Sequence, residues 1–297
     1  MRLITRGDMD GLCCAVLLTT RENIDEIVFA HPKDMQDGLV EVRPGDIIAN
    51  LPYHPMCDMW FDHHESEQET ANVAEYRGLF GLAPSAARLV YQYYDDRELD
   101  RFGELLAETD RIDSARLAIE DISDPQGWVL ISYTLDPRSG LGAFRQYFLR
   151  LVEAGRVNRV AEILAMPDVQ EKVARFMSEQ ERYADVTREL SRVDENVIIT
   201  DFRELDSQPV GNRFLVYTLF PSANISVRLF WGRGRDNIVA AVGKSIFNRS
   251  CKTHVGNMLA EYGGGGLQGA GTAQFAPDVA EAKTAEIVAR LKADDKA

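Results

Sequence analysis

The sequence predicts an α/β protein in which a parallel sheet with flanking helices is joined by further helices to a smaller α+β domain. In the first half, short apolar runs typical of buried strands alternate with helical patterns. A long helical stretch follows from about 143 to 192, and strand patterns resume in a cluster at 196. Strands clustered after helices indicate a second domain. We therefore place one domain, including the helical connector, at residues 1–190 and the other at residues 195–297.

Composition excludes several classes of function. The chain has 297 residues, of which 45% are hydrophobic and 27% charged, as in an ordinary globular protein long enough for two domains. A net charge of −14 argues against binding extended nucleic acid, which requires a basic surface. No apolar stretch is long enough to span a bilayer, so we expect no membrane association. The negative net charge is still compatible with a small anionic substrate, because a bound divalent cation dominates the electrostatic field within its own site.

The four cysteines predict a reducing, cytoplasmic environment. Cys13, Cys14, Cys57 and Cys251 form no CxxC pair, and their spacing suggests neither a disulfide framework nor a structural zinc site. The N-terminus enters a strand-like run without the pattern of a signal peptide. The sequence is compatible with a homodimer but does not determine the oligomeric state.

The first strand leads into an acidic turn. The run 3–5 is typical of a short buried strand, and the run 12–18 contains good helix formers. Asp8 and Asp10 lie between them in an Asp-x-Asp-Gly sequence. A single aspartate there is adequately explained as a turn or N-cap residue. Two aspartates directly after a first strand favour metal ligation.

Further strands of this sheet are predicted at 27–30, 46–50 and 59–61. The last one delivers Asp62, His63 and His64 to the carboxyl edge, where open α/β sheets bind ligands. Oxygen and imidazole donors together suit Mn²⁺, Zn²⁺ or Fe²⁺ better than Ca²⁺. His31 and His54 each precede a proline, and a loop role without metal fits them at least as well.

Two helices are predicted to follow, at 83–94 and 98–109. Asp110 comes directly after the apolar pattern of the second helix and is a candidate to point back into the site. Asp113 with Ser114 fits a plain helix cap, so we rank Asp113 below Asp110 as a ligand.

Strands of the second domain are predicted at 196–201, 214–220, 225–231 and 238–242. The tail after Leu291 is expected to be poorly anchored.

A glycine-rich segment is the other informative feature of this domain. Gly264, Gly265 and Gly266 belong to a run of four glycines, which lets the backbone approach a ligand and cradle an oxyanion. A flexible linker is the usual explanation of such a run, but this one lies inside the domain. Three side chains would supply charge and hydrogen bonds to a phosphate, although each is also an ordinary surface type: Arg228, Asn248 and Arg249.

The order of these motifs resembles the DHH/DHHA1 phosphoesterase superfamily over nearly the whole chain, and most of all its bacterial exopolyphosphatase-like proteins. The resemblance implies a DHH metal-binding domain followed by a DHHA1 substrate-binding domain, with Mn²⁺ (or Mg²⁺) as cofactor. It implies hydrolysis of a small phosphorylated anion, such as polyphosphate, pAp or a short nucleotide, by metal-activated water.

The resemblance also assigns roles to residues. The positions that match metal ligands are Asp8, Asp10, His63 and Asp110. His64 matches a position that contacts substrate phosphate, and Asp62 one that supports the histidines, so that Asp62, His63 and His64 form the implied catalytic group.

Three positions depart from the family pattern. Arg6 replaces a usual histidine, Asn50 a usual aspartate, and Leu267 a histidine after the glycine run. A permanent cation and a neutral amide are poor metal ligands, so we expect one well-occupied metal site and a weak or absent second. The alternative function is a degenerate member that binds a phosphate-rich ligand without turnover.

Overall fold

The computed structural model describes residues 1–135, 141–206, 209 and 211–296. Its secondary structure separates into two compact units, each with its own sheet. The first comprises 1–116 and 125–173, and the second 117–124 and 174–297. The division falls inside helix α10 (Pro167–Glu189), whereas the sequence places the domain boundary at 190–195. None of the described helices is long and apolar enough to cross a membrane.

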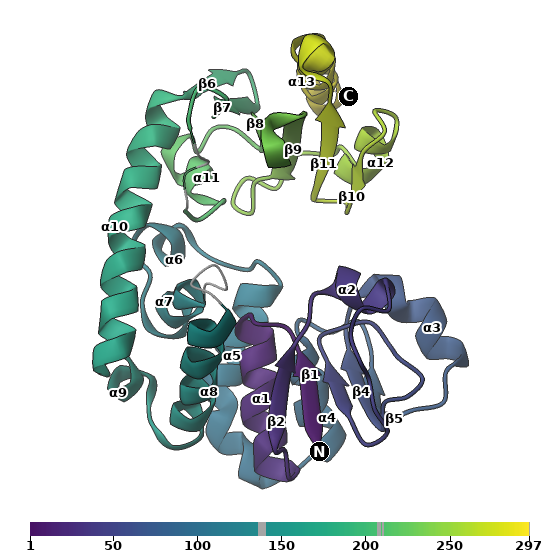
Figure 1. Cartoon of the computed structure of the whole chain (residues 1–297). Coiled ribbons are helices and arrows are strands. Elements are labelled where there is room, and N and C mark those ends of the chain that lie inside the picture. The colour runs from purple at the N-terminus through teal and green to yellow at the C-terminus, as the bar shows by residue number, and fades with distance from the viewer. Residues whose placement is uncertain (136–140, 207–208, 210, 297) are drawn as a thin grey trace. The chain divides into compact units, whose positions relative to one another are not determined.

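The first unit is built on a five-stranded, entirely parallel sheet with strand order β2-β1-β3-β4-β5 (Figure 1). The strands are β1 (Arg2–Thr5), β2 (Glu26–Phe29), β3 (Ile47–Ala49), β4 (Met59–Asp62) and β5 (Arg77–Phe80). Because β1 lies between β2 and β3, the chain order reverses at β1. Ligands of open α/β sheets bind at the carboxyl ends of the strands beside such a reversal.

Helix α1 (Met9–Arg21) forms the centre of the main hydrophobic core of this unit. Residues 9–18 are all buried, because the helix packs between the sheet and helices α4 (Ala86–Tyr94), α5 (Gly103–Asp113) and α8 (Leu141–Val157). The shorter helices are α2 (Pro32–Gln36), α3 (Gln68–Val73), α7 (Gly127–Thr134) and α9 (Val160–Leu164). Short 3₁₀ helices lie at Glu65–Glu67 and Arg97–Phe102.

The second unit contains a mixed sheet with strand order β10-β11-β9-β8-β7-β6, in which only β7 and β8 pair in parallel. Its strands are β6 (Ser191–Asp194), β7 (Val197–Asp201), β8 (Ile225–Trp231), β9 (Ile238–Lys244), β10 (Gly265–Gly266) and β11 (Ala270–Phe275). Its helices are α6 (Ile119–Ser123), α11 (Leu215–Leu219), α12 (Val255–Ala260) and α13 (Pro277–Lys296), with a 3₁₀ turn at Arg233–Arg235. The predicted α/β fold class with a second α+β unit is confirmed.

Two local expectations about this unit were wrong. The segment 214–220 contains helix α11 rather than a strand, and Val216 and Tyr217 pack there against Ile198 of β7. The tail after Leu291 is anchored, because Asp294 accepts a hydrogen bond from the Thr253 hydroxyl at 2.8 Å.

Candidate active site

Asp10 is a buried acidic residue at the carboxyl edge of the parallel sheet. Its side chain is 1% exposed, and its two oxygens accept hydrogen bonds from the backbone N–H groups of Ala86 (2.9 Å) and Ala87 (2.8 Å) at the start of α4. Burial raises the pKa of this carboxyl group. Gly11 permits the tight turn before it, since a Cβ there would lie 2.0 Å from the Arg6 carbonyl oxygen. Asp10 is therefore fixed in position before any ligand binds.

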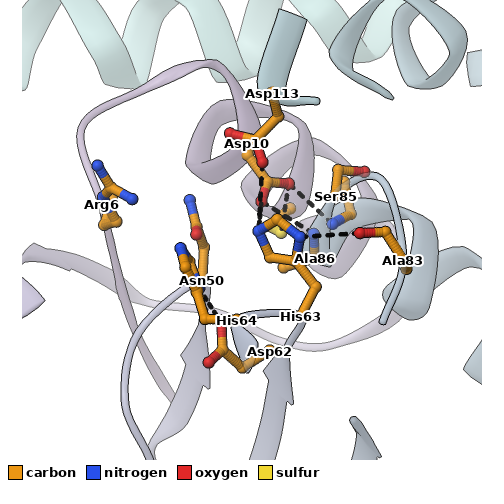
Figure 2. A network of polar contacts seen from close by, with 12 residues as sticks. Arg6, Asp10, Asn50, Asp62, His63, His64, Ala83, Ser85, Ala86 and Asp113 are labelled. Atoms are coloured by element: carbon orange, nitrogen blue, oxygen red, sulfur yellow. Dashed lines mark hydrogen bonds and ion pairs between the residues drawn. The ribbon is translucent and has the colours of Figure 1, made fainter. Parts of the chain in front are cut away.

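His63 directly follows β4 and faces Asp10 (Figure 2). Its Nδ1 lies 3.0 Å from the Ala83 carbonyl oxygen, which can only accept, so Nδ1 carries a proton. Its Nε2 lies 3.7 Å from Asp10 Oδ2 and 3.2 Å from Asp113 Oδ2, yet this buried atom has no hydrogen-bond partner. In the neutral ring, the Nε2 lone pair thus points at carboxylate oxygens, an arrangement that a cation between them stabilises.

Asp113 completes this group from the last turn of α5. Its side chain is 26% exposed, and its pKa is raised by partial burial and by the charges of Asp10 and Asp8. One ligand atom from each of Asp10, His63 and Asp113 lies within 4.8 Å of the others. Two carboxylates and one imidazole suit a divalent ion such as Mn²⁺, Zn²⁺ or Fe²⁺, so these residues fit the metal that the resemblance implies.

The other two predicted ligands have partners from the chain itself. Asp110 accepts hydrogen bonds from the Ser85 hydroxyl (2.7 Å) and from Arg88 Nε (2.9 Å). Asp8 caps α1 by accepting from the Gly11 N–H. The structure therefore brings together Asp10 and His63 of the predicted set and adds Asp113 to them.

The sequence places Asp113 three residues after Asp110, one turn further along the same helix, where an aspartate also fits a cap. Its proximity to His63 depends on the docking of α5 against α1 and α4, which no local pattern encodes.

Asp62 and His64 form a second pair beside His63. Asp62 is fully buried, and its Oδ1 lies 2.7 Å from His64 Nδ1, while its Oδ2 has no partner. This hydrogen bond raises the pKa of His64, whose side chain is 39% exposed. Asp62 therefore holds the His64 ring through Nδ1, which leaves Nε2 without a partner from Asp62.

In the second unit, the predicted phosphate contact Arg228 lies on β8. Its guanidinium makes no hydrogen bond or ion pair with any described residue. The pKa of nearby Arg213 is lowered by burial and by the charge of Arg228, so two cations share one region. Asn248 instead accepts from the Ser250 hydroxyl at 2.8 Å, and Arg249 donates to the Ile246 carbonyl at 3.0 Å.

The glycine segment forms a hairpin packed against helix α12. A Cβ on Gly264 would lie 2.2 Å from the Thr272 carbonyl oxygen, and one on Gly266 would lie 2.3 Å from that of Ala270. These two glycines are therefore required by the chain's own packing. Gly265 faces open space, and Leu267 is 77% exposed at the tip. Of the three predicted contacts, Gly265 is the one with room for a ligand.

Solved structures provide a comparison over the full length of the chain. A pGpG-specific phosphodiesterase, PggH from Vibrio cholerae, is 37% identical, with a TM-score of 0.86, and 99% of each chain is covered. An exopolyphosphatase-related protein from Bacteroides fragilis (12% identity, TM-score 0.53, coverage of 99% and 92%) shares the fold. So does RecJ from Thermus thermophilus in complex with Mn²⁺ (14%, 0.57), although the match covers 98% of this chain and 52% of RecJ. No protein-family model and no curated protein matches the sequence.

This chain belongs to the DHH/DHHA1 phosphoesterase superfamily. Within it, the likeness to the pGpG-specific enzyme extends to sequence, whereas the likeness to the exopolyphosphatase-related protein is one of fold alone.

Proposed function

We propose that this protein is a divalent-metal-dependent phosphodiesterase that hydrolyses the phosphodiester bond of a short 5′-phosphorylated dinucleotide, with pGpG as the first candidate. The observation that carries the proposal is the group of Asp10, His63 and Asp113, in which an imidazole lone pair faces carboxylate oxygens. The 37% identity to a pGpG-specific phosphodiesterase over both entire chains supports the choice of substrate.

Asp10, His63 and Asp113 would hold the metal ion. When bound there, a divalent ion supplies a nucleophile from water near neutral pH and neutralises charge on the phosphoryl oxygens. Ala83, Ala86 and Ala87 keep the ligands oriented through their backbone groups.

His64 would bind the scissile phosphate. Its Nδ1 proton is held by Asp62, which leaves Nε2 at the exposed edge of the ring. The raised pKa of His64 favours the doubly protonated ring, so that Nε2–H donates to a phosphoryl oxygen.

The second unit has its own candidate contacts for an anion. Arg228 offers a guanidinium without a carboxylate partner among the described residues, and Gly265 offers an open stretch of backbone.

Product analysis on a substrate panel tests this function. With Mn²⁺, we expect conversion of pGpG to GMP, and slower or no release from pAp and polyphosphate. His63→Ala should abolish turnover, whereas His31→Ala, which removes the exposed N-cap of α2, should preserve it. Preferred cleavage of polyphosphate would refute the substrate assignment. If folded, Mn²⁺-loaded protein hydrolyses none of these compounds, the result would favour the alternative function, in which the protein binds a phosphate-rich ligand without turnover.

A further inference from the structure

The Asp8 carboxylate has three polar partners from its own chain. Its Oδ1 accepts from the Gly11 N–H at 2.9 Å and from Asn50 Nδ2 at 3.0 Å. Its Oδ2 forms an ion pair with Arg6 Nε at 3.0 Å. Because one of these partners is a cation, a metal ion gains less at Asp8 than at a carboxylate without an ion pair.

Asn50 is the neutral hydrogen-bond donor to Asp8, and its backbone conformation is unusual. It is fully buried directly after β3, with a left-handed backbone (φ 59°) that asparagine and aspartate tolerate better than other residues with side chains. A carboxylate here would face that of Asp8 at hydrogen-bond distance, and such a pair requires a proton or a cation between its members. The amide of Asn50 removes this requirement.

Arg6 contributes a permanent charge on the same side of the molecule. Its side chain is 34% exposed, and beyond Asp8 no described residue forms an ion pair or hydrogen bond with it. Its ion-pair partner Asp8 is the N-cap of α1 and lies two residues before Asp10, so Arg6 is tied to the turn that carries Asp10. In Figure 2, Asn50 and His64 lie between Arg6 and His63.

We propose that Arg6 is the resident second cation of this active site: its free guanidinium nitrogens bind a substrate phosphoryl oxygen, while Arg6 and Asn50 together restrict the centre to a single metal ion. Nε holds Asp8, which leaves the Nη groups to form the paired hydrogen bonds that guanidinium makes with phosphate. The inference rests on the proposed phosphodiesterase function for the identity of the anion, but the metal count stands without it.

Metal stoichiometry tests the first part. Titration calorimetry with Mn²⁺ should give about one ion per wild-type chain and about two for the double variant Arg6→His/Asn50→Asp, which supplies an imidazole and a carboxylate beside Asp8. Two ions of similar affinity in the wild type, or about one in the double variant, would overturn the restriction to a single metal.

Binding of GMP to the Mn²⁺-loaded protein tests the second part without turnover. Arg6→Ala should retain about one Mn²⁺ but lose about tenfold or more in GMP affinity, since a hydrogen bond to a charged group is lost. Arg6→Lys should recover the affinity only in part, because an ammonium lacks the planar fork. Guanosine, which has no phosphate, should bind wild type and variants alike.

An unchanged GMP affinity in folded Arg6→Ala would refute phosphate binding by Arg6. Failure of the proposed function gives a different pattern: wild-type protein would leave pGpG intact, yet still bind about one Mn²⁺ and lose GMP affinity on loss of Arg6.

Discussion

The Nε2 atom of His63 and the Oδ2 atom of Asp113 lie 3.2 Å apart, although they come from the end of β4 and the end of α5. The other ring nitrogen, Nδ1, donates a hydrogen bond to the Ala83 carbonyl. An imidazole lone pair and a carboxylate oxygen are thus held face to face, and this contact distinguishes Asp113 from Asp110.

Exchange of each aspartate for its amide separates the two roles. Asp113→Asn should weaken Mn²⁺ binding by at least about tenfold, because it removes a ligand. Asp110→Asn should leave Mn²⁺ affinity nearly unchanged and lower the free energy of unfolding by about 1–3 kcal/mol, since it weakens the bond to Arg88. Calorimetric titration and denaturant unfolding measure these effects. The reverse pattern would restore Asp110 as the ligand.

Thermal stability of the metal-free protein should fall as pH rises from about 4 to about 8. Burial raises the pKa of Asp10, so the folded chain binds this proton more tightly than the unfolded chain, and folding is favoured at low pH. Asp113, with its raised pKa, adds to the same trend. Mn²⁺ at a hundredfold excess over its Kd should stabilise the protein by about 2.7 kcal/mol.

Melting curves in EDTA and in Mn²⁺ across this pH range provide the measurement. The gap between the two Tm values should widen with pH, since protons compete with the ion. A gap that is constant with pH, or a metal-free Tm that rises with pH, would argue against ligation by buried carboxyl groups.

The hairpin of the second unit should depend on Gly256 rather than on Gly269. A Cβ on Gly256 would lie 2.1 Å from the Gly266 carbonyl oxygen, whereas one on Gly269 would meet no atom within 4 Å. Gly256→Ala should therefore cost about 1–3 kcal/mol of unfolding free energy, and Gly269→Ala should be nearly neutral. Equal losses for the two alanine variants in urea unfolding would show that the close contact is relieved at little cost.

Thiol labelling of the native protein should modify Cys57 before the other cysteines. Cys13 and Cys14 are fully buried in α1, and burial raises their pKa values, so little reactive thiolate forms. Cys57 is partly exposed, although its pKa is also raised, to about 11. Mass spectrometry after brief alkylation at mildly alkaline pH gives the order, and early modification of Cys13 would contradict the packing of α1.

The strand-end motifs were predictable because they depend on local order in the sequence. Short apolar runs followed by Asp8-x-Asp10 and by Asp62-His63-His64 indicate a parallel sheet with polar groups at one edge. The sheet order then brings β1, β3 and β4 together, as observed.

Other features depended on tertiary packing. The aromatic and β-branched residues of 214–220 favour a strand by propensity, but Val216 and Tyr217 bury their side chains as one short helix. In the same way, tertiary packing gives the two aspartates of α5 different partners: Asp110 binds Ser85 and Arg88, whereas Asp113 lies beside His63.

The anchoring of Asp10 by α4 also has a consequence for the order in which the protein assembles. Asp10 and Ala86 are separated by 76 positions in the chain, so their hydrogen bond forms only after α1 and α4 have docked against the sheet. A nascent chain that has not reached α5 also lacks Asp113. The proposed ion-binding group is therefore complete only when these elements have docked, and capture of Mn²⁺ should report a chain whose first unit has reached its native topology.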